Sequence, residues 1–528
     1  MRKLIDSRLE QLARAGQVHL LRKGLKGLEK ESLRITTAGE IARTPHPKAL
    51  GSALTHPAIT TDYSEALIEL ITPPFEDSAD TLAAMEDLHR FVHANIGDEL
   101  LLATSMPCRI EGDESIPIAC YGNSNIGRMK HVYRRGLGYR YGRAMQAIAG
   151  VHFNYSVSEE LWPVLQAMAA DRRSLAEFVA DRYFGMVRNI QRFGWLILYL
   201  FGSSPALSKS FLAGRETPLA SSFTEFDPTT WHRPYATSLR MSDIGYRNDN
   251  QASLDISFNR LEDYVRDLSH AISTPYAPYQ AIGVEVDGEY RQLNANILQI
   301  ENEYYSTVRP KQITRSGEMP TLALKKRGVR YLELRSVDLN CYHPAGISLE
   351  QLRFLEIFML LSLLAASPPM STEEKKTSAN NMLATACCGR TPGMTLIRDN
   401  TAVDLRAWAK ELCESMAPIA AALDGDSTGG GFSAALEHQY VAIANPEQCL
   451  PSARMLREMR GNHESFAEFA QRLSLQHAES LRSPPSLPAE KAEAMRRMAE
   501  TSLAEQESVE AGDSLAFADY LKHYFAQT

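Results

Sequence analysis

Two short segments that lie far apart in the chain place charged side chains at alternating positions. They are Gly27-Leu28-Glu29-Lys30-Glu31-Ser32-Leu33-Arg34 and Tyr331-Leu332-Glu333-Leu334-Arg335-Ser336-Val337. Successive side chains of a strand point to opposite faces, so we expect two strands, one with Glu29 and Glu31 on the same face and the other with Glu333 and Arg335 on the same face. A sheet face rich in carboxylates is unfavourable inside a large protein unless cations neutralise it. Mg²⁺ binds through carboxylate oxygens, often together with substrate phosphates, so the pattern predicts a site for metal ions and a nucleotide.

The size and composition of the chain exclude several classes of protein. The chain has 528 residues, of which 44% are hydrophobic, enough for a large core in about two to four domains. With 56 basic and 64 acidic residues its net charge is −8, which gives no electrostatic support for binding nucleic acid. The seven cysteines are odd in number and lack a Cys-x-x-Cys motif, which argues against a disulfide scaffold or a zinc site and favours a reducing cytoplasm.

Neither a secretion signal nor a membrane span is expected. The segment Met1–Arg8 carries charges where a signal peptide needs an apolar run. The longest apolar segments, Phe193–Phe201 and Phe354–Ala366, are shorter than the roughly 20 residues that cross a bilayer. We therefore expect both to be buried helices of a cytoplasmic protein, although the second contains a charged residue, Glu356.

Hydrophobic periodicity and capping residues predict the main helices. Ser174 with Glu177, and Ser348 with Gln351, fit the capping box that begins a helix. The second of these helices is expected to stop at Pro368-Pro369. The helical segments are expected at residues 79–96 and 174–201, after residue 348, and in part of residues 2–26.

Strand and loop predictions follow from alternation and from glycine content. The segment Val151–Ser156 alternates and would place His152, Asn154 and Ser156 on one face. Residues 280–304 contain two more alternating stretches, which predict an antiparallel sheet. Residues 105–143 are rich in Gly, Asn, Arg and Tyr and are predicted to form a long functional loop region.

The character of the chain changes near residue 372. Beyond it the sequence is rich in Ala, Glu and Met and reads as helical to its end, interrupted by Gly425–Gly431 and by residues 483–488. We therefore predict an α+β catalytic domain at residues 1–372 and a mainly helical C-terminal lobe at residues 373–528. The lobe either supports the sheet or covers the site, and the sequence leaves both open.

The acidic candidates form one group with a histidine, namely Glu29, Glu31, Asp62, Glu65, Glu69, His152 and Glu333. Carboxylates with a single imidazole suit two or three Mg²⁺ or Mn²⁺ ions better than zinc, which prefers nitrogen and sulfur. The segment Asp62–Glu69 fits a helix or a strand, and in either case its carboxylates cluster. Taken singly, each of these residues is most often a solvated surface charge, so the prediction depends on their combination.

Basic segments supply candidates for binding phosphate. The first runs from Tyr121 to Arg135 and combines glycines with Lys130, Arg134 and other basic residues. Arg309-Pro310-Lys311 and Arg315–Glu318 are similar, and arginine binds oxygens through two parallel hydrogen bonds. An exposed basic loop is the competing interpretation. Gly429-Gly430-Gly431 has no Walker-type Lys-Ser/Thr and is expected to be a linker.

The chain resembles the glutamate–cysteine ligases of the first bacterial type. The resemblance covers roughly residues 20–370 in the family's order. Lys30 and Ser32 replace a usual Arg and Thr, and Cys341-Tyr342-His343 departs from the usual turn. The matching segments, all read from the sequence, are 27–34, 50–56, 60–67, 105–108, 121–135, 150–154, 192–195, 235–243, 299–303, 309–311 and 333–336.

The resemblance implies a glutamine-synthetase-like α+β fold, whose curved antiparallel sheet forms a basin for ATP, metal ions and amino acids. It assigns one metal ion to Glu31, Asp62 and Glu69, and another to Glu29, His152 and Glu333. Arg335, Arg134 and Glu333 are the implied catalytic residues, with Arg335 and Asn154 also binding substrate. Lys130, Arg134, Arg309 and Lys311 are expected to bind ATP. The implied cysteine pocket comprises Tyr133, Arg240, Tyr246 and Tyr305.

The implied reaction joins L-glutamate to L-cysteine with ATP, by way of γ-glutamyl phosphate, in the first step of glutathione biosynthesis. Mg²⁺ or Mn²⁺ is the expected cofactor, in two or three ions. We further expect a cytoplasmic monomer that binds neither nucleic acid nor membrane, with feedback inhibition by glutathione. A related carboxylate–amine ligase with another amine substrate is the second hypothesis. A non-catalytic binding protein is the third, and it would be expected to lose acidic ligands.

Overall fold

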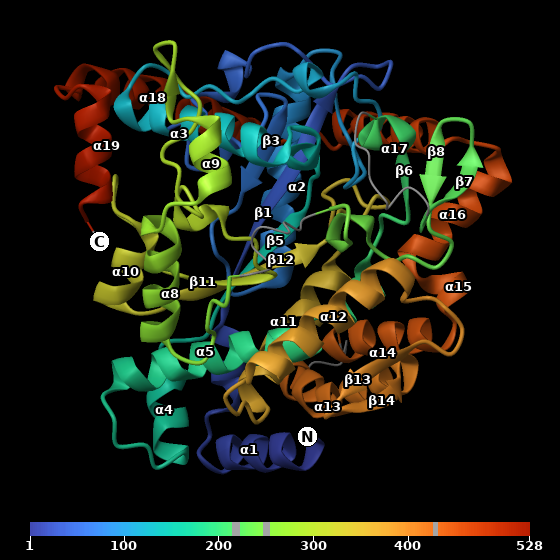
Figure 1. Cartoon of the computed structure of the whole chain (residues 1–528). Helices are drawn as coiled ribbons and strands as arrows, with labels where there is room; N and C mark the ends of the chain where they lie inside the picture. The colour runs from blue at the N-terminus through green and yellow to red at the C-terminus, as the bar shows by residue number, and fades with distance from the viewer. Residues whose placement is uncertain (214–221, 246–253, 426–430, 528) are drawn as a thin grey trace.

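A seven-stranded antiparallel sheet forms the centre of the computed structural model, which describes residues 1–213, 222–245, 254–425 and 431–527 (Figure 1). Six strands follow the order β11-β12-β5-β1-β3-β2, and β4 pairs with the end of β1. In that order the strands are β11 Val308–Lys311, β12 Tyr331–Val337, β5 Val151–Ser156, β1 Leu25–Ile35, β3 Leu67–Ile71 and β2 Ile59–Thr61, with β4 at Leu100–Leu101.

The two faces of this sheet differ in chemistry, as the alternation predicted. Glu29 lies opposite His152, Glu31 opposite Glu69, and Arg309 opposite Glu333, so these side chains share one face. Leu332 and Leu334 point to the other face and are fully buried. The helices that pack on the sheet include α2 (Ser78–Asn95), α5 (Leu175–Phe193) and α11 (Leu349–Leu364).

The local predictions of helix starts and of the β5 strand are confirmed. Ser174 with Glu177 and Ser348 with Gln351 both form complete capping boxes. The helix expected at 174–201 is interrupted at Gly194, where α5 gives way to α6 (Trp195–Phe201). α11 ends at Leu364, before the proline pair that was expected to stop it.

The prediction of a long loop at residues 105–143 is wrong for its second half. Residues Asn125–Tyr141 form helix α3, which Ser124 caps by accepting a hydrogen bond from the backbone of Gly127. The glycines that suggested a loop allow close packing instead. A Cβ at Gly136 would overlap the side chain of Gln299, and one at Gly138 would lie 2.7 Å from the Tyr63 hydroxyl.

Three further expectations need correction. Residues 62–66 are neither helix nor strand but the turn between β2 and β3. The segment 280–304 forms only a hairpin of two-residue strands, β9 (Glu285–Val286) and β10 (Glu289–Tyr290), outside the central sheet. The chain beyond residue 372 is not helical throughout, because β13 (Thr395–Arg398) and β14 (Thr401–Asp404) form another hairpin.

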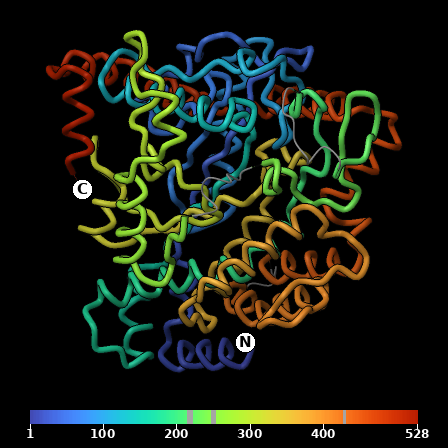
Figure 2. Tube along the Cα trace, in the orientation of Figure 1, coloured from blue at the N-terminus to red at the C-terminus, as the bar shows by residue number. Residues whose placement is uncertain are grey.

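The C-terminal third wraps around the sheet body. After α12 (Thr372–Cys388), helices α13 (Leu405–Asp424) and α14 (Gly431–Ala444) pack on α11. The chain then runs upward along the right side of the molecule in this view as α15 (Pro446–Cys449), α16 (Pro451–Asn462) and α17 (Phe466–Arg482). It crosses the top as α18 (Ala489–Gly512) and ends on the left as α19 (Phe517–Phe525) (Figure 2). The domain boundary at residue 372 stays a prediction, and residues on both sides of it share one hydrophobic core.

The remaining elements complete the frame. None of the described helices is long and apolar enough to cross a bilayer. The other α-helices are α1 Arg2–Arg14, α4 Leu161–Met168, α8 Leu261–Ser273, α9 Ala277–Ile282 and α10 Pro320–Arg327, and a three-stranded sheet contains β6 Ala206–Ser208, β7 Thr224–Asp227 and β8 Thr230–His232.

One buried ion pair joins the back of the sheet to α11. Lys26 Nζ on β1 lies 2.8 Å from Glu356 Oε1, and both side chains are 1% exposed. Ser78 also donates a hydrogen bond to Glu356, and Lys26 donates to the carbonyl oxygen of Gly24. Each charge therefore depends on the other for compensation, because neither reaches water.

Removing one member of this pair should be far more destabilising than removing both. We expect Glu356→Ala to lower the free energy of unfolding by about 3–5 kcal/mol, because it leaves Lys26 charged and unpaired in the core. The double variant Lys26→Met/Glu356→Leu should recover most of that loss. Urea unfolding monitored by circular dichroism measures both, and a single variant as stable as the wild type would contradict this account.

Candidate active site

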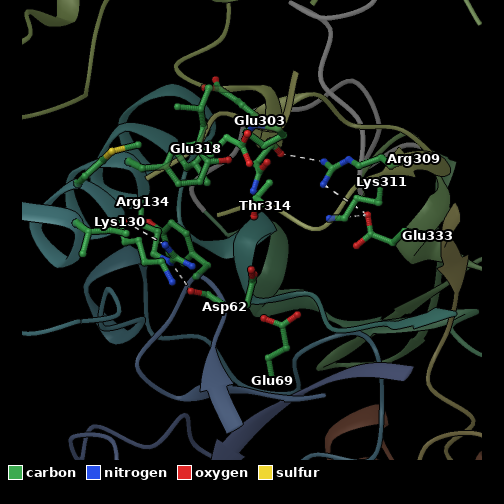
Figure 3. Close-up of a pocket in the computed structure, with 18 of the residues that line it drawn as sticks. Asp62, Glu69, Lys130, Arg134, Glu303, Arg309, Lys311, Thr314, Glu318 and Glu333 are labelled. Atoms are coloured by element: carbon green, nitrogen blue, oxygen red, sulfur yellow. Dashed lines mark hydrogen bonds and ion pairs between the residues drawn. The ribbon is translucent and has the colours of Figure 1, made fainter. Parts of the chain in front are cut away.

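The charged face of the sheet forms the floor of a pocket of about 520 Å³. Figure 3 shows Lys130 and Arg134 of α3 on one side and Arg309, Lys311 and Glu333 on the other. Asp62 and Glu69 lie below them, Glu303 and Glu318 lie above, and Thr314 lies between the two sides. Strands, helix α3 and several loops thus converge on one cavity.

Glu29, His152 and Glu333 make the tightest group of metal-binding atoms in the described part of the chain. One ligand atom from each lies within 4.8 Å of the others. The Nδ1 atom of His152 lies 3.2 Å from Glu29 and 3.5 Å from Glu333. The second ring nitrogen of His152, Nε2, is buried and makes no hydrogen bond within the described residues. The donor set of two carboxylates and an imidazole therefore fits a divalent cation.

The other three acidic residues of the predicted metal sites lie beside this group but less tightly. Glu31 is buried, accepts a hydrogen bond from Gly150 N at 2.8 Å, and approaches His152 Nε2 at 3.6 Å. Glu69 lies opposite Glu31 in the sheet, and Asp62 lines the same pocket. Glu65, which the acidic pattern included, is not part of the cluster. It accepts hydrogen bonds from the backbones of His46 and Cys120, because the turn directs it away.

The carboxylates differ in their proton affinity. Burial alone would raise the pKa of Glu333, but Lys311 and Arg335 hold it well below its usual value. Burial and the neighbouring charges of Glu29 and Asp62 raise the pKa of Glu69 well above its usual value. The cationic side chains of the protein thus offset the negative charge on only one side of the floor, around Glu333. The other side needs bound protons or metal ions to offset its negative charge.

Two basic groups face each other across the floor. Lys311 Nζ lies 3.4 Å and Arg335 Nη1 2.9 Å from the carboxylate of Glu333, and Arg309 approaches it at 4.0 Å. On α3, the Arg134 guanidinium stacks on the ring of Tyr121 at 4.6 Å and donates to the carbonyl oxygen of Asp62. Burial and Arg134 lower the pKa of Lys130 to about 8. These cations suit the phosphates of a nucleotide.

The residues predicted to bind an amino acid fall into three groups. Tyr133 and Tyr305 line the pocket, and the Tyr305 hydroxyl accepts a hydrogen bond from Gln146. Arg240 is fully buried, donates to the carbonyl oxygen of Arg335 at 2.8 Å, and is not among the pocket-lining residues. Asn154 donates to Glu29 at 2.8 Å. Tyr246 lies outside the described residues.

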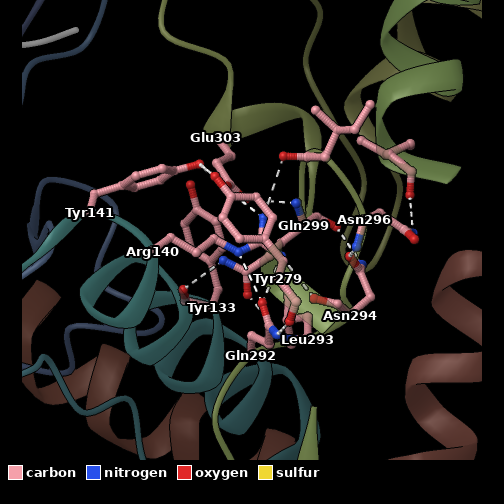
Figure 4. Close-up of polar contacts among 12 residues, drawn as sticks. Tyr133, Arg140, Tyr141, Tyr279, Gln292, Leu293, Asn294, Asn296, Gln299 and Glu303 are labelled. Carbon is pink, nitrogen blue, oxygen red and sulfur yellow. Dashed lines mark hydrogen bonds and ion pairs between the residues drawn. The ribbon is translucent and has the colours of Figure 1, made fainter. Parts of the chain in front are cut away.

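A buried polar network fixes the pocket wall that contains Tyr133 and Tyr305. Arg140, near the end of α3, forms an ion pair with Glu303 at 2.8 Å, and both side chains are 0% exposed. Arg140 also donates to Gln292 and to the carbonyl oxygen of Asn294 (Figure 4). The network therefore holds α3 against the segment of residues 292–303.

Sequence reasoning missed several residues of the pocket. Glu303 and Gln146 carry no local pattern that marks them. Tyr520 and Tyr524 of α19 come from the end of the predicted helical lobe, where no pattern marks them as pocket residues. Their place in the pocket follows from tertiary packing alone.

Comparisons with known proteins agree with this geometry. A family model described as glutamate–cysteine ligase matches residues 9–385. The chain is 51% identical to the glutamate–cysteine ligase of Azotobacter vinelandii, covering 100% of this chain and 99% of that protein. It is 46% identical to that of Alcanivorax borkumensis, covering 99% of each.

Solved structures give the same result. A crystal structure of glutamate–cysteine ligase from Francisella tularensis in complex with AMP superposes with a TM-score of 0.89 at 34% identity, over 96% of this chain and 98% of that one. A bifunctional glutathione synthetase from Pasteurella multocida has a TM-score of 0.72 at 25% identity, over 90% of this chain and 55% of that one.

Proposed function

The chain belongs to the glutamate–cysteine ligase family, and we propose that the charged floor of its pocket binds metal ions and phosphates for that reaction. The reaction joins the γ-carboxylate of L-glutamate to the amine of L-cysteine with ATP, through γ-glutamyl phosphate, as the first step of glutathione biosynthesis. The observation that carries the residue assignment is the convergence of Glu29, His152 and Glu333 beside Lys311 and Arg335. A relative solved with AMP supports a nucleotide in this pocket.

The two steps of the reaction place different demands on the site. In the first, a γ-carboxylate oxygen of glutamate attacks the terminal phosphorus of ATP and the bond to ADP breaks. In the second, the cysteine nitrogen attacks the acyl carbon, phosphate leaves, and the amine loses a proton. Splitting the reaction in this way replaces one difficult step with two easier ones, because a free carboxylate is a poor acyl donor.

We assign the two sides of the floor to complementary roles. Glu29, His152 and Glu333 would hold one Mg²⁺ or Mn²⁺ ion, and Glu31, Asp62 and Glu69 another. The bound ions supply positive charge next to the phosphates. Arg335 and Arg309, which the sheet holds rigidly beside Glu333, would orient the oxygens of the phosphoryl group and offset their charge as it moves. Lys130, Lys311 and Arg134 would bind the remaining phosphate oxygens.

We assign binding of the amino-acid substrates to the pocket wall that contains Tyr133 and Tyr305. Tyr133 and Tyr305 line the cavity, and the Arg140–Glu303 network fixes the elements that carry them. Arg240 is assigned a positioning role, because its hydrogen bond holds the backbone of Arg335. Asn154 would act in the same way on Glu29. Cytoplasmic location, a monomeric state and feedback inhibition by glutathione remain predictions.

The reaction itself is tested by ADP release from ATP, Mg²⁺ and L-glutamate, with L-cysteine present or absent. We expect ADP release to depend on L-cysteine and the product to have the mass of γ-glutamylcysteine. ADP release with another amine but not with cysteine would instead support the related carboxylate–amine ligase. No ADP release with any amine would support a binding protein.

Replacing Glu333 should abolish most of the activity without unfolding the chain. We expect Glu333→Gln to lower kcat/KM by about 100- to 1000-fold, because it removes a metal-binding charge while keeping the shape of the side chain. Glu40→Gln, at an exposed surface turn, is the matched control and should retain full activity. Near-normal turnover in Glu333→Gln, with an unchanged unfolding midpoint in both variants, would refute the metal assignment.

Binding of the metal ion should release protons. The raised pKa of Glu69 means that its carboxyl group keeps a proton to higher pH than an ordinary glutamate does, and a metal ligand must lose it. Affinity for Mg²⁺ or Mn²⁺ should therefore weaken as the pH falls. Isothermal titration calorimetry in two buffers of different ionisation enthalpy measures the protons released, and Glu69→Gln should release fewer. Identical heats in the two buffers would contradict this expectation.

A further inference from the structure

The last helix of the chain belongs to the wall of the pocket, although it lies far beyond the residues that the family model covers. The model ends at residue 385, and α19 occupies Phe517–Phe525. Tyr520 and Tyr524 of this helix line the same cavity as Glu29 and Glu333. Tyr524 is 8% exposed, and Tyr520 is half-buried.

One end of α19 is fixed to the start of α3. The backbone of Asn125 donates to Asp513, and the Asn125 side chain donates to the carbonyl oxygen of Leu515 at 2.9 Å. The Arg128 guanidinium stacks on the ring of Phe517 at 4.4 Å. α3 carries Lys130 and Arg134 into the pocket, so α19 is attached to the same element that supplies these cations.

The other end of α19 is fixed to a loop on the pocket rim. The Gln527 side chain donates to the carbonyl oxygen of Gly317 at 2.7 Å and accepts from the backbone of Met319 at 3.3 Å. Residues 314–318 of this loop line the pocket. Arg327 of α10 forms an ion pair with Glu318 at 2.6 Å. The loop is therefore held by Gln527 and by Arg327. The helix bridges two walls of the cavity.

The chemistry of the cavity is not uniform along its length. Its floor is charged, with carboxylates and cations on the strands. Its lining also includes apolar and aromatic side chains, namely Ile126, Met129, Ile300, Pro320 and, from α19, Tyr520 and Tyr524. ATP has the same division, because its triphosphate is highly charged whereas its base is a flat aromatic ring that stacks on aromatic side chains.

We propose that α19 forms the nucleoside-binding wall of the pocket, with Tyr520 and Tyr524 contacting the nucleoside of ATP. Gln527 acts as a positioning residue that holds loop 314–318 against it. The inference rests on the proposed binding of ATP in this cavity. The proposal also gives the C-terminal helices a role, because α19 covers the site and does not only support the sheet.

Nucleotide binding at equilibrium tests this proposal without depending on turnover. The protein is titrated with AMP, ATP and inorganic tripolyphosphate in the presence of Mg²⁺. Tyr524→Ala should weaken binding of AMP and ATP by about tenfold, the loss expected for one aromatic contact with a base, and leave tripolyphosphate binding unchanged. Tyr524→Phe should retain most of the affinity, because it keeps the ring. Lys522→Ala, on the exposed side of α19, is the matched control.

Enzyme kinetics and trypsin cleavage test the positioning role of Gln527. Gln527→Ala should raise KM for ATP several-fold with little change in kcat or in KM for L-glutamate, and should speed trypsin cleavage after the exposed Arg315. Thermal unfolding of every variant identifies a general loss of structure. Equal losses for AMP and tripolyphosphate, or a change confined to KM for an amino acid, would overturn the proposal. If wild-type protein binds AMP but makes no ADP, the proposed function fails while the nucleoside wall stands.

Discussion

The structure depends on the placement of several carboxylates and one imidazole on a single face of an antiparallel sheet. The β-pairing puts Glu29 opposite His152 and Glu31 opposite Glu69, so their spacing is set by backbone hydrogen bonds. Such a face is unfavourable in a protein interior unless cations are close. Strands β11 and β12 supply cations to Glu333, and burial leaves Glu69 with a raised pKa. This uneven distribution of positive charge among the carboxylates makes the floor suitable for metal ions and phosphates.

The sequence predicted the parts of this arrangement that follow from local geometry. Alternation on a strand has a period of two whatever the rest of the fold does, so the shared face of Glu333 and Arg335 could be read directly. Capping boxes are equally local. The segment Asp62–Glu69 belongs to the predicted acidic group without a definite local structure, because it fits a helix or a strand equally well, and only the family resemblance assigns Asp62 and Glu69 to a metal ion. The turn between β2 and β3 removes Glu65 from the cluster.

Helix α3 shows why the remaining predictions failed. Its glycines suggested a loop, since glycine usually disfavours a helix interior. Two of those glycines instead meet residues that are distant in sequence, Gln299 beside Gly136 and Tyr63 beside Gly138. Tertiary packing therefore overrides the intrinsic preference, and only a three-dimensional structure shows it. Tyr524 was missed for a similar reason, because nothing in a helical C-terminal segment indicates which distant cavity it reaches.

The elements of the pocket differ in how much freedom they leave to substitution. The floor is made of paired strands, where moving one residue by a single position would turn its side chain to the opposite face. The walls are made of α3, α19 and loop 314–318, which single side-chain contacts such as those of Asn125 and Gln527 hold in place. Changes in those contacts would shift the walls without altering the strand register that sets the positions of the charges below.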